Sequence, residues 1–400
     1  MLIRGGAAAL ALCTTLSAAV VVPPGPDWTA ASAQAAPAVT SSGYTVVADH
    51  LNNPRQITVS GGDLYVAEAG AGGSVCPVTG WCVGFTGSVT RVHRGRATRP
   101  QTGLLSLSTP NGQVLGAEAV AADADGLFAV VSGSCALAAP QVPAAVVAQA
   151  GQVVQLLGGS TVRPLGDASG PACSTAAASE VGTARVAATD PYGLAVAGGS
   201  FWVADAGAGN VVQLPAHPGD TSPTPPPAVV ALSTAALAQA AQAAAGPSAR
   251  GVRHRTAPTA LAVGPDGALY VATMDPGGVT GADAVYRVDP GSAAVTLYAG
   301  QLSAVTGLAF DRSGTLYACE WTTGYTGDGP DADGDVVEIP WRATDHGRQV
   351  LGAGLLHYPG GVAVLDGAVY VSNWSIAGSQ DGPLGPGAHG QLVRLGPPAG

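Results

Sequence analysis

Residues 259–272, TALAVGPDGALYVA, have the pattern of a β-hairpin. An apolar strand runs to Val263, a Gly-Pro-Asp-Gly turn follows, and a second apolar strand closes the stretch. Pro265 sets the φ angle that the turn needs, and Gly267 can adopt a backbone conformation that other residues resist. A single hairpin cannot bury its own apolar face, so this one requires neighbours.

The same hairpin recurs five more times, and its second strand is the part that aligns best. The six copies are LYVAE at 64–68, LFAVV at 127–131, FWVAD at 201–205, LYVAT at 269–273, LYACE at 316–320 and VYVSN at 369–373. A third strand of one pattern follows each copy, as in GSVTRV from Gly87, and a fourth usually comes next, as in VTLYAG at 295–300. Each unit is therefore a four-stranded antiparallel meander, which is typical of a propeller blade.

The repeats allow two architectures, an open solenoid or a closed ring. A ring leaves only short exposed edges, and the ends of the chain favour it. The sixth unit ends at Leu395 with only three strands, whereas an unpaired strand, Tyr44 to Leu51, lies near the N-terminus. We therefore expect an all-β fold, with residues 43–396 forming one six-bladed β-propeller whose last blade is completed by the N-terminal strand.

The first 35 residues have the features of a secretory signal peptide. Arg4 precedes an apolar stretch at 7–22, and small-residue cleavage sites lie near residues 33–36. A retained membrane anchor is the alternative, but the apolar stretch is short for a bilayer span. We expect residues 1–35 to be removed, residues 36–42 to be flexible, and the mature protein to be a secreted monomer without membrane contact.

Composition excludes one class of partner. The 400 residues carry a formal net charge of −10 and show no basic stripe. Nucleic-acid binding requires clustered cations that displace counterions, so we expect no nucleic-acid partner.

The cysteines are consistent with an exported protein. Cys76 and Cys82 bracket the short loop CPVTGWC, and Cys135 and Cys173 form a plausible second pair. Oxidising conditions outside the cell favour disulfides at both pairs. Cys319 falls within a strand, where we expect a buried free thiol.

The loop lengths indicate which face of the propeller binds ligands. The loops between second and third strands are short in blade 3 but long in blades 1, 2, 5 and 6. They emerge beside the loops that join one blade to the next, on a side that we call the insertion-rich face. Variable loops on a rigid scaffold commonly carry recognition.

Residues 215–256 add an irregular insertion between blades 3 and 4. We expect a strand near residues 229–232 and an Ala-rich helix at residues 233–245. The alternative is that this insertion is an exposed loop without a binding role.

Several motifs support a family resemblance. They are LNNPRQI and LYVAEAG in blade 1, GFTGSVTRV in its third strand, DPYGLAV in blade 3, PTALAVGPDGALYVAT in blade 4, and YPGGVAV with AVYVSN in blade 6. Their order resembles that of the six-bladed propellers of the ScyD/ScyE family, over nearly the whole chain after the signal region. Asp190 stands where the family pattern has Asn. The blades also resemble, more distantly, NHL repeats, TolB-like propellers and calcium-dependent lactonases and phosphotriesterases of the gluconolactonase type.

Two sets of polar residues are expected at the mouth of the central channel on the insertion-rich face. The first set starts the innermost strands: Asn53, Glu118, Asp190, Thr259, Thr306 and His357. The second set ends the second strands: Glu68, Asp205, Thr273, Glu320 and Asn373. We predict ligand binding by Asn53, Glu68, Glu118, Asp190, Asp205, Glu320, His357 and Asn373. Carboxylate oxygens suit Ca²⁺, which we place on Glu118, Asp190 and Asp205; solvated loop ends or local turn caps are the alternative.

A second acidic cluster, GDGPDADGD at 327–335, has alternating carboxylates. It does not match a calcium-binding EF-hand loop, because Gly334 is misplaced and no Glu closes the set, which favours an acidic surface turn. The chain also contains no Gly-x-Ser-x-Gly elbow and no His-Glu-x-x-His motif.

These patterns favour a secreted binding module for a small molecule, glycan or protein, without an assignable catalytic residue. The alternative follows from the resemblance to gluconolactonase-type propellers. It is a calcium-dependent hydrolase of lactones or similar esters, in which the metal at the channel mouth polarises the carbonyl.

Overall fold

The hairpin at 259–272 forms as its sequence predicts. In the computed structural model, β17 (Ala257–Val263) pairs antiparallel with β18 (Leu269–Met274). Gly267 has a φ of 75° and donates a hydrogen bond of 2.9 Å from its N–H to the carbonyl of Gly264, so the turn requires the glycine found there.

The structure describes residues 40–41, 43–78, 80–133, 142–168, 189–216, 228–230, 257–275, 278–326, 329–330, 333–341, 347–378 and 389–396. The expected signal peptide, the pair Cys135 and Cys173, and the Ala-rich helix lie outside the described residues.

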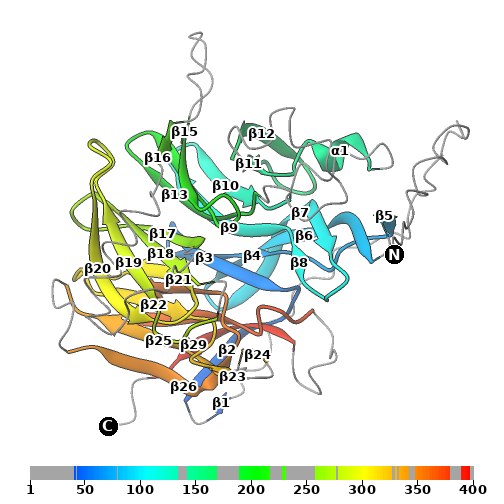
Figure 1. The fold of residues 1–400 in the computed structure, drawn as a ribbon. Coiled ribbons are helices and arrows are strands. Elements are labelled where there is room, and N and C mark those ends of the chain that lie inside the picture. Colours follow the sequence, from blue (N-terminus) through cyan, green and yellow to red (C-terminus); the bar gives the residue numbers. More distant parts are fainter. Residues whose placement is uncertain are drawn as a thin grey trace, which may run out of the picture. The chain divides into compact units, whose positions relative to one another are not determined.

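Six antiparallel sheets follow one another along the chain and form a six-bladed propeller (Figure 1). Blade 1 contains β3 (Pro54–Ser60), β4 (Asp63–Glu68), β6 (Trp81–His93) and β7 (Arg96–Ser108), extended by β5 (Val75–Val78) and β8 (Val114–Leu115). Blade 2 contains β9 (Ala117–Asp123), β10 (Gly126–Val131), β11 (Gln152–Leu156) and β12 (Val162–Asp167), with the short helix α1 (Ala144–Val147) before β11. Blade 3 contains β13 (Pro191–Ala197), β14 (Ser200–Asp205), β15 (Asn210–Pro215) and β16 (Ala228–Val230).

The remaining blades repeat this order from the innermost strand outward. Blade 4 contains β17, β18, β19 (Asp283–Val288) and β20 (Val295–Leu302). Blade 5 contains β21 (Val305–Phe310), β22 (Leu316–Glu320), β25 (Asp333–Ile339) and β26 (Gln349–His357), and the small pair β23 (Tyr325–Thr326) and β24 (Gly329–Pro330) lies in its loop. Blade 6 contains β27 (Gly361–Leu365), β28 (Ala368–Asn373), β29 (Gly390–Leu395) and β2 (Tyr44–Leu51).

The N-terminal strand closes the ring, as the sequence predicts. β2 pairs antiparallel with β29, with Tyr44 opposite Leu395 and Leu51 opposite Gly390. Thr40–Ser41 form the short strand β1, which pairs with β2. The flexibility of residues 36–42 stays a prediction. The first and last strands of the propeller are therefore held together in one sheet.

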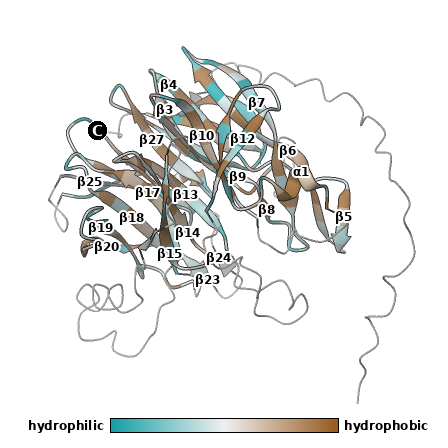
Figure 2. Cartoon of the chain, turned by 90° about the horizontal axis from the view of Figure 1, so that it is seen from above, coloured by the Kyte–Doolittle hydropathy of each residue, from teal (hydrophilic) through white to brown (hydrophobic). Residues whose placement is uncertain are grey.

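The core lies between the blades. Among the described residues, each pair of neighbouring blades shares one cluster of buried hydrophobic side chains. Between blades 6 and 1, Leu51 and Leu392 of the closing blade pack with Val66 of β4. Figure 2 shows these hydrophobic residues in brown along the strands. Each such side chain contributes roughly 1.5–3 kcal/mol when fully buried, so the interfaces between blades account for much of the stability.

The first disulfide prediction is confirmed. Cys76 of β5 and Cys82 of β6 are bonded within the long insertion of blade 1, and Cys319 is a buried free thiol. In the described parts of the chain, no helix reaches the length and hydrophobicity that a bilayer span requires.

Candidate functional site

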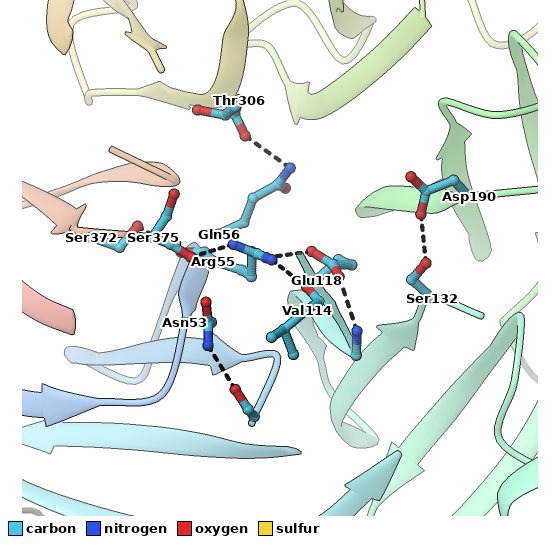
Figure 3. Close-up of polar contacts among 12 residues, drawn as sticks. Asn53, Arg55, Gln56, Val114, Glu118, Ser132, Asp190, Thr306, Ser372 and Ser375 are labelled. Atoms are coloured by element: carbon cyan, nitrogen blue, oxygen red, sulfur yellow. Dashed lines mark hydrogen bonds and ion pairs between the residues drawn. The ribbon is translucent and has the colours of Figure 1, made fainter. Parts of the chain in front are cut away.

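Arg55 of β3 is the polar centre of the channel, and it was not among the residues predicted from the sequence. Its Nε donates to Glu118 Oε2 at 2.7 Å, and its Nη2 donates to the Val114 carbonyl at 2.5 Å. Its Nη1 donates to the carbonyl of Ser375 (Figure 3). One buried guanidinium therefore connects blade 1 with its neighbours on both sides, blades 2 and 6.

Glu118 is fully buried beside this guanidinium. Burial raises its pKa to about 7; the charge of Arg55 opposes this shift, and the neighbouring Asp190 adds to it. Its Oε1 accepts a hydrogen bond of 3.0 Å from the Gly116 N–H, so both of its oxygens have partners. A carboxyl group with a pKa near neutrality can bind or release a proton under ordinary conditions.

Asp190 and Tyr192 complete this group. Asp190 accepts a hydrogen bond of 2.5 Å from the Ser132 hydroxyl, and burial raises its pKa. Burial also raises the pKa of Tyr192, and Arg55, Glu118 and Asp190 all act on the Tyr192 hydroxyl. We call Arg55, Glu118, Asp190 and Tyr192 the polar layer. It contains two carboxyl groups, one phenol and one cation at the start of the innermost strands.

Gln56 spans the channel next to the polar layer. Its Nε2 donates to the carbonyls of Thr259 at 2.8 Å and Thr306 at 3.0 Å, which belong to blades 4 and 5. On its other side, the backbone at Gln56 packs closely against β27 of blade 6, because a Cβ added at Gly361 would lie 2.6 Å from Gln56 Cα. Gln56 therefore ties blade 1 to the opposite side of the ring.

Beyond Gln56 the channel opens into a cavity of about 330 Å³ lined by the innermost strands of all six blades. Most of the side chains that line it are apolar, as at Val59, Leu194 and Phe310, but polar atoms make up more than half of the surface that faces the cavity. A larger hollow of about 770 Å³ next to it is lined mainly by the turns of blades 4, 5 and 6, including Pro265. The cavity therefore lies at the hairpin-turn end of the channel, away from the insertion-rich face.

The predicted residues at the ends of the second strands have a shared structural role. In four blades this side chain accepts a hydrogen bond from a backbone N–H that precedes the innermost strand of the same blade. The acceptors and donors are Glu68 with Asn52 at 2.7 Å, Asp205 with Asp190 at 2.8 Å, Glu320 with Ser303 at 2.8 Å, and Asn373 with His357 at 2.6 Å. These contacts are local turn caps, which the sequence allowed as the alternative to ligand binding by these residues.

Glu68 has further structural partners. Its carboxylate accepts two hydrogen bonds from Arg99, each 2.9 Å long, and one of 2.6 Å from the Thr90 hydroxyl. Asn53, another predicted ligand-binding residue, donates from Nδ2 to the Gly70 carbonyl at 2.8 Å. Both side chains therefore hold the loops of blade 1.

His357 lies farther from the central channel than the alignment of the six repeats predicted. It ends β26, the outer strand of blade 5, whereas the innermost strand of blade 6 starts at Gly361. Its ring stacks on Trp374 with centroids 4.4 Å apart, and its Nδ1 lies 3.5 Å from Asp333 Oδ1.

A buried acidic cluster joins blades 4 and 5. Asp283, Glu320 and Asp335 are 2%, 7% and 6% exposed, and one oxygen of Asp283 and one of Asp335 has no hydrogen-bond partner. Burial raises the pKa of all three, and the charge of Asp335 raises that of Glu320 further. Two facing carboxylates repel each other, so Glu320 retains its proton more readily than an exposed glutamate.

The predicted calcium ligands do not form a compact group. Among the described residues, the one set of three or more His, Cys, Asp or Glu side chains with ligand atoms within 4.8 Å is Asp49, His50 and His389. Glu118 already pairs with a guanidinium, whose charge would repel Ca²⁺. Calcium on Glu118, Asp190 and Asp205 therefore stays a prediction without support from this geometry.

Comparisons with known proteins find structural neighbours at low similarity. No protein-family model and no curated protein matches the chain. Similar solved structures include a chain of a nidogen–laminin complex, at 15% identity over 74% of this chain and 86% of that chain, with a TM-score of 0.41. Two others are a putative gluconolactonase (13% identity, 92% and 87% coverage, TM-score 0.35) and a gluconolactonase from Xanthomonas campestris (14%, 90% and 97%, 0.38).

The sheet topology defines the class of protein as an all-β six-bladed propeller, and its structural neighbours include a chain of a nidogen–laminin complex and gluconolactonases. At these identities the likeness concerns the fold alone. Membership of the ScyD/ScyE family stays a prediction.

Proposed function

We propose that this protein is a secreted binding module whose small-molecule ligand enters the central channel. The cavity of about 330 Å³, to which all six innermost strands contribute, is the observation that supports this proposal. Small-molecule sites typically occupy about 300–1,000 Å³ and combine apolar walls with a few polar groups. This cavity lies at the lower end of that range, and it combines apolar side chains with a large share of polar surface.

The lining suggests the chemistry of the ligand. Val59, Leu194 and Phe310 offer apolar contact, which suits a ring system or a short aliphatic group. Both hydrogens of the Gln56 amide nitrogen bind backbone carbonyls, which leaves Gln56 Oε1 to accept a hydrogen bond. The expected ligand therefore has an apolar body and a hydrogen-bond donor at one end.

1-Naphthol has these properties and tests the proposal. We expect one saturable site by fluorescence and calorimetric titration. Ala122 lines the cavity, so Ala122→Phe should fill part of it and weaken binding at least tenfold. Ala124 is exposed at the adjacent turn, so Ala124→Phe is the matched control and should bind like the wild type. Undiminished binding in Ala122→Phe, or no saturation by about 1 mM in the wild type, would contradict the proposal.

A second candidate function is hydrolysis of a lactone or similar ester in the polar layer. The observation that favours it is the pKa of Glu118, about 7, beside the Arg55 guanidinium. Glu118 would accept a proton from an attacking water, and Arg55 would stabilise the developing oxyanion. In this arrangement the Arg55 guanidinium stabilises the oxyanion in place of a metal ion. A calcium ion at the same position would be repelled by the charge of the guanidinium.

A pH-indicator assay with simple δ-lactones distinguishes the two candidates. A hydrolase should lose most of its activity in Glu118→Gln and retain it in EDTA. Activity that depends on calcium would restore the metal-dependent mechanism expected from the resemblance. A wild-type rate equal to the buffer rate would rule out this second candidate and leave the binding module.

A further inference from the structure

Three metal-binding side chains meet where the two ends of the propeller join. Asp49 and His50 lie near the end of β2, and His389 directly precedes β29, the strand that pairs with β2. One ligand atom from each of the three lies within 4.8 Å of the other two. Asp49 Oδ1 is 2.7 Å from His389 Nε2, and the rings of His50 and His389 stack with centroids 4.6 Å apart.

We propose that Asp49, His50 and His389 form a binding site for a divalent transition metal ion of the zinc class, which joins the N-terminal and C-terminal strands. Two imidazoles and one carboxylate are a common ligand set for zinc. A fourth position would remain for water or another ligand. This site is separate from the cavity and from the polar layer, so it does not depend on the proposed function.

The geometry is nearly, but not fully, that of a bound site. Donor atoms of a tetrahedral zinc site with bonds of about 2.0–2.1 Å lie about 3.3 Å apart. The three ligand atoms lie within 4.8 Å of one another, so a movement of at most about 1.5 Å by a side chain brings them to this spacing. His50 is exposed, and rotation of its side chain supplies this movement without displacing the strands.

The neighbouring backbone and charges suit a cation. The His50 carbonyl accepts a hydrogen bond of 2.9 Å from Arg99, which fixes the chain at this position. The guanidinium of Arg99 is paired with Glu68, so its charge is largely neutralised. The His50 N–H donates to Asp49 Oδ1 at 2.9 Å, which orients the carboxylate.

A metal at this position would stabilise the closure of the ring. Its ligands come from opposite ends of the chain, so an unfolded chain does not hold them together. An ion that binds only the folded state raises the unfolding temperature as its concentration increases. The propeller would then be held shut by both the β2–β29 pairing and the metal.

Zinc titration of the full mature chain without a histidine tag, after removal of metals, tests the site. We expect one equivalent of zinc to bind, with an increase in melting temperature. His50→Gln and His389→Gln should each weaken binding at least tenfold and remove the thermal shift. His93→Gln is the matched control, because His93 pairs with Asp63 in blade 1, and should bind zinc like the wild type.

Cobalt provides a readout of the ligands themselves. Co²⁺ bound by two imidazoles and a carboxylate should give visible absorption bands, which His50→Gln should abolish. His50 is exposed, so this variant should fold normally, as its circular dichroism spectrum will show. Absence of zinc binding in the wild type, or unchanged zinc affinity in both histidine variants, would overturn the proposal.

Discussion

Replacing Arg55 by Met tests whether the polar layer has the structure described above. The substitution removes the guanidinium and so leaves the Glu118 carboxyl and the carbonyls of Val114 and Ser375 without their donor. Removing one partner of a buried ion pair typically costs about 3–5 kcal/mol. We expect a loss of up to this size in the free energy of unfolding at pH 8, where Glu118 of the wild type is ionised. Without the guanidinium the pKa of Glu118 rises further, so proton uptake by the variant limits the loss.

The cost should be smaller in acid. The pKa of Glu118 is about 7, so at pH 5.5 the carboxyl is protonated and no unpaired charge is created. The remaining loss comes from three hydrogen bonds, two to carbonyls and one to the Glu118 carboxyl, at about 0.5–1.5 kcal/mol each. Arg55→Lys, which keeps the charge but not the planar donor group, should lie between the wild type and Arg55→Met at pH 8.

Urea unfolding followed by circular dichroism at pH 8 and pH 5.5 measures these differences. Glu118→Gln and the double variant complete a double-mutant cycle, which isolates the coupling between Arg55 and Glu118. A coupling energy at pH 8 below about 0.5 kcal/mol would refute the reasoning, since that is the value for independent sites. So would an Arg55→Met penalty that is equal at both pH values.

Three further predictions concern stability. The pKa of Glu118 is raised from 4.5 to about 7 in the folded state, so its stabilising contribution is complete below about pH 4.5 and is lost as pH rises through 7. We expect the free energy of unfolding of the wild type to fall over this range by up to ~3 kcal/mol, and the urea midpoint to fall with it. A midpoint that rises toward pH 8 would contradict this. Replacing Cys76 and Cys82 by Ser should cost about 2 kcal/mol in thermal or urea unfolding, because the loop they close is short; an unchanged melting temperature would show that the bond does not stabilise the fold. Gly361→Ala should cost about 1–3 kcal/mol because its Cβ would meet backbone 2.6 Å away, whereas Gly378→Ala, with open space around it, should be neutral; equal melting of both variants would refute the close packing.

The sequence predicted the blades because their information is local. Alternating strands, Gly-rich turns such as that at Gly267, and a fixed repeat order specify each four-stranded sheet. The missing strand of the last blade also predicted the pairing of β2 with β29. The pairing of Thr40–Ser41 was missed, since two residues carry too little pattern to be recognised as a strand.

The candidate site was only partly predictable. Glu118 and Asp190 were identified because acidic residues at the start of an innermost strand stand out. Arg55, Gln56 and Tyr192 were missed because their partners belong to other blades, far away in the sequence. The LNNPRQI motif contains Arg55 and Gln56, but nothing in a single sequence shows that both side chains reach across the channel.

The second-strand residues illustrate a different limit. Glu68 and Asp205 lie at the ends of their strands, as predicted, but their carboxylates cap loops of their own blades. An acid at a strand end is compatible with either a binding role or a cap. Only the position of the accepted backbone N–H distinguishes the two.

The central claim is that the channel cavity is the ligand site, and a crystal structure of the mature protein soaked with 1-naphthol tests it most directly. The account predicts density for the ring between Val59, Leu194 and Phe310, with the naphthol oxygen within hydrogen-bonding distance of Gln56 Oε1. Density for the compound only on the insertion-rich face would contradict the account. So would a channel that contains no naphthol density although the protein binds naphthol in solution.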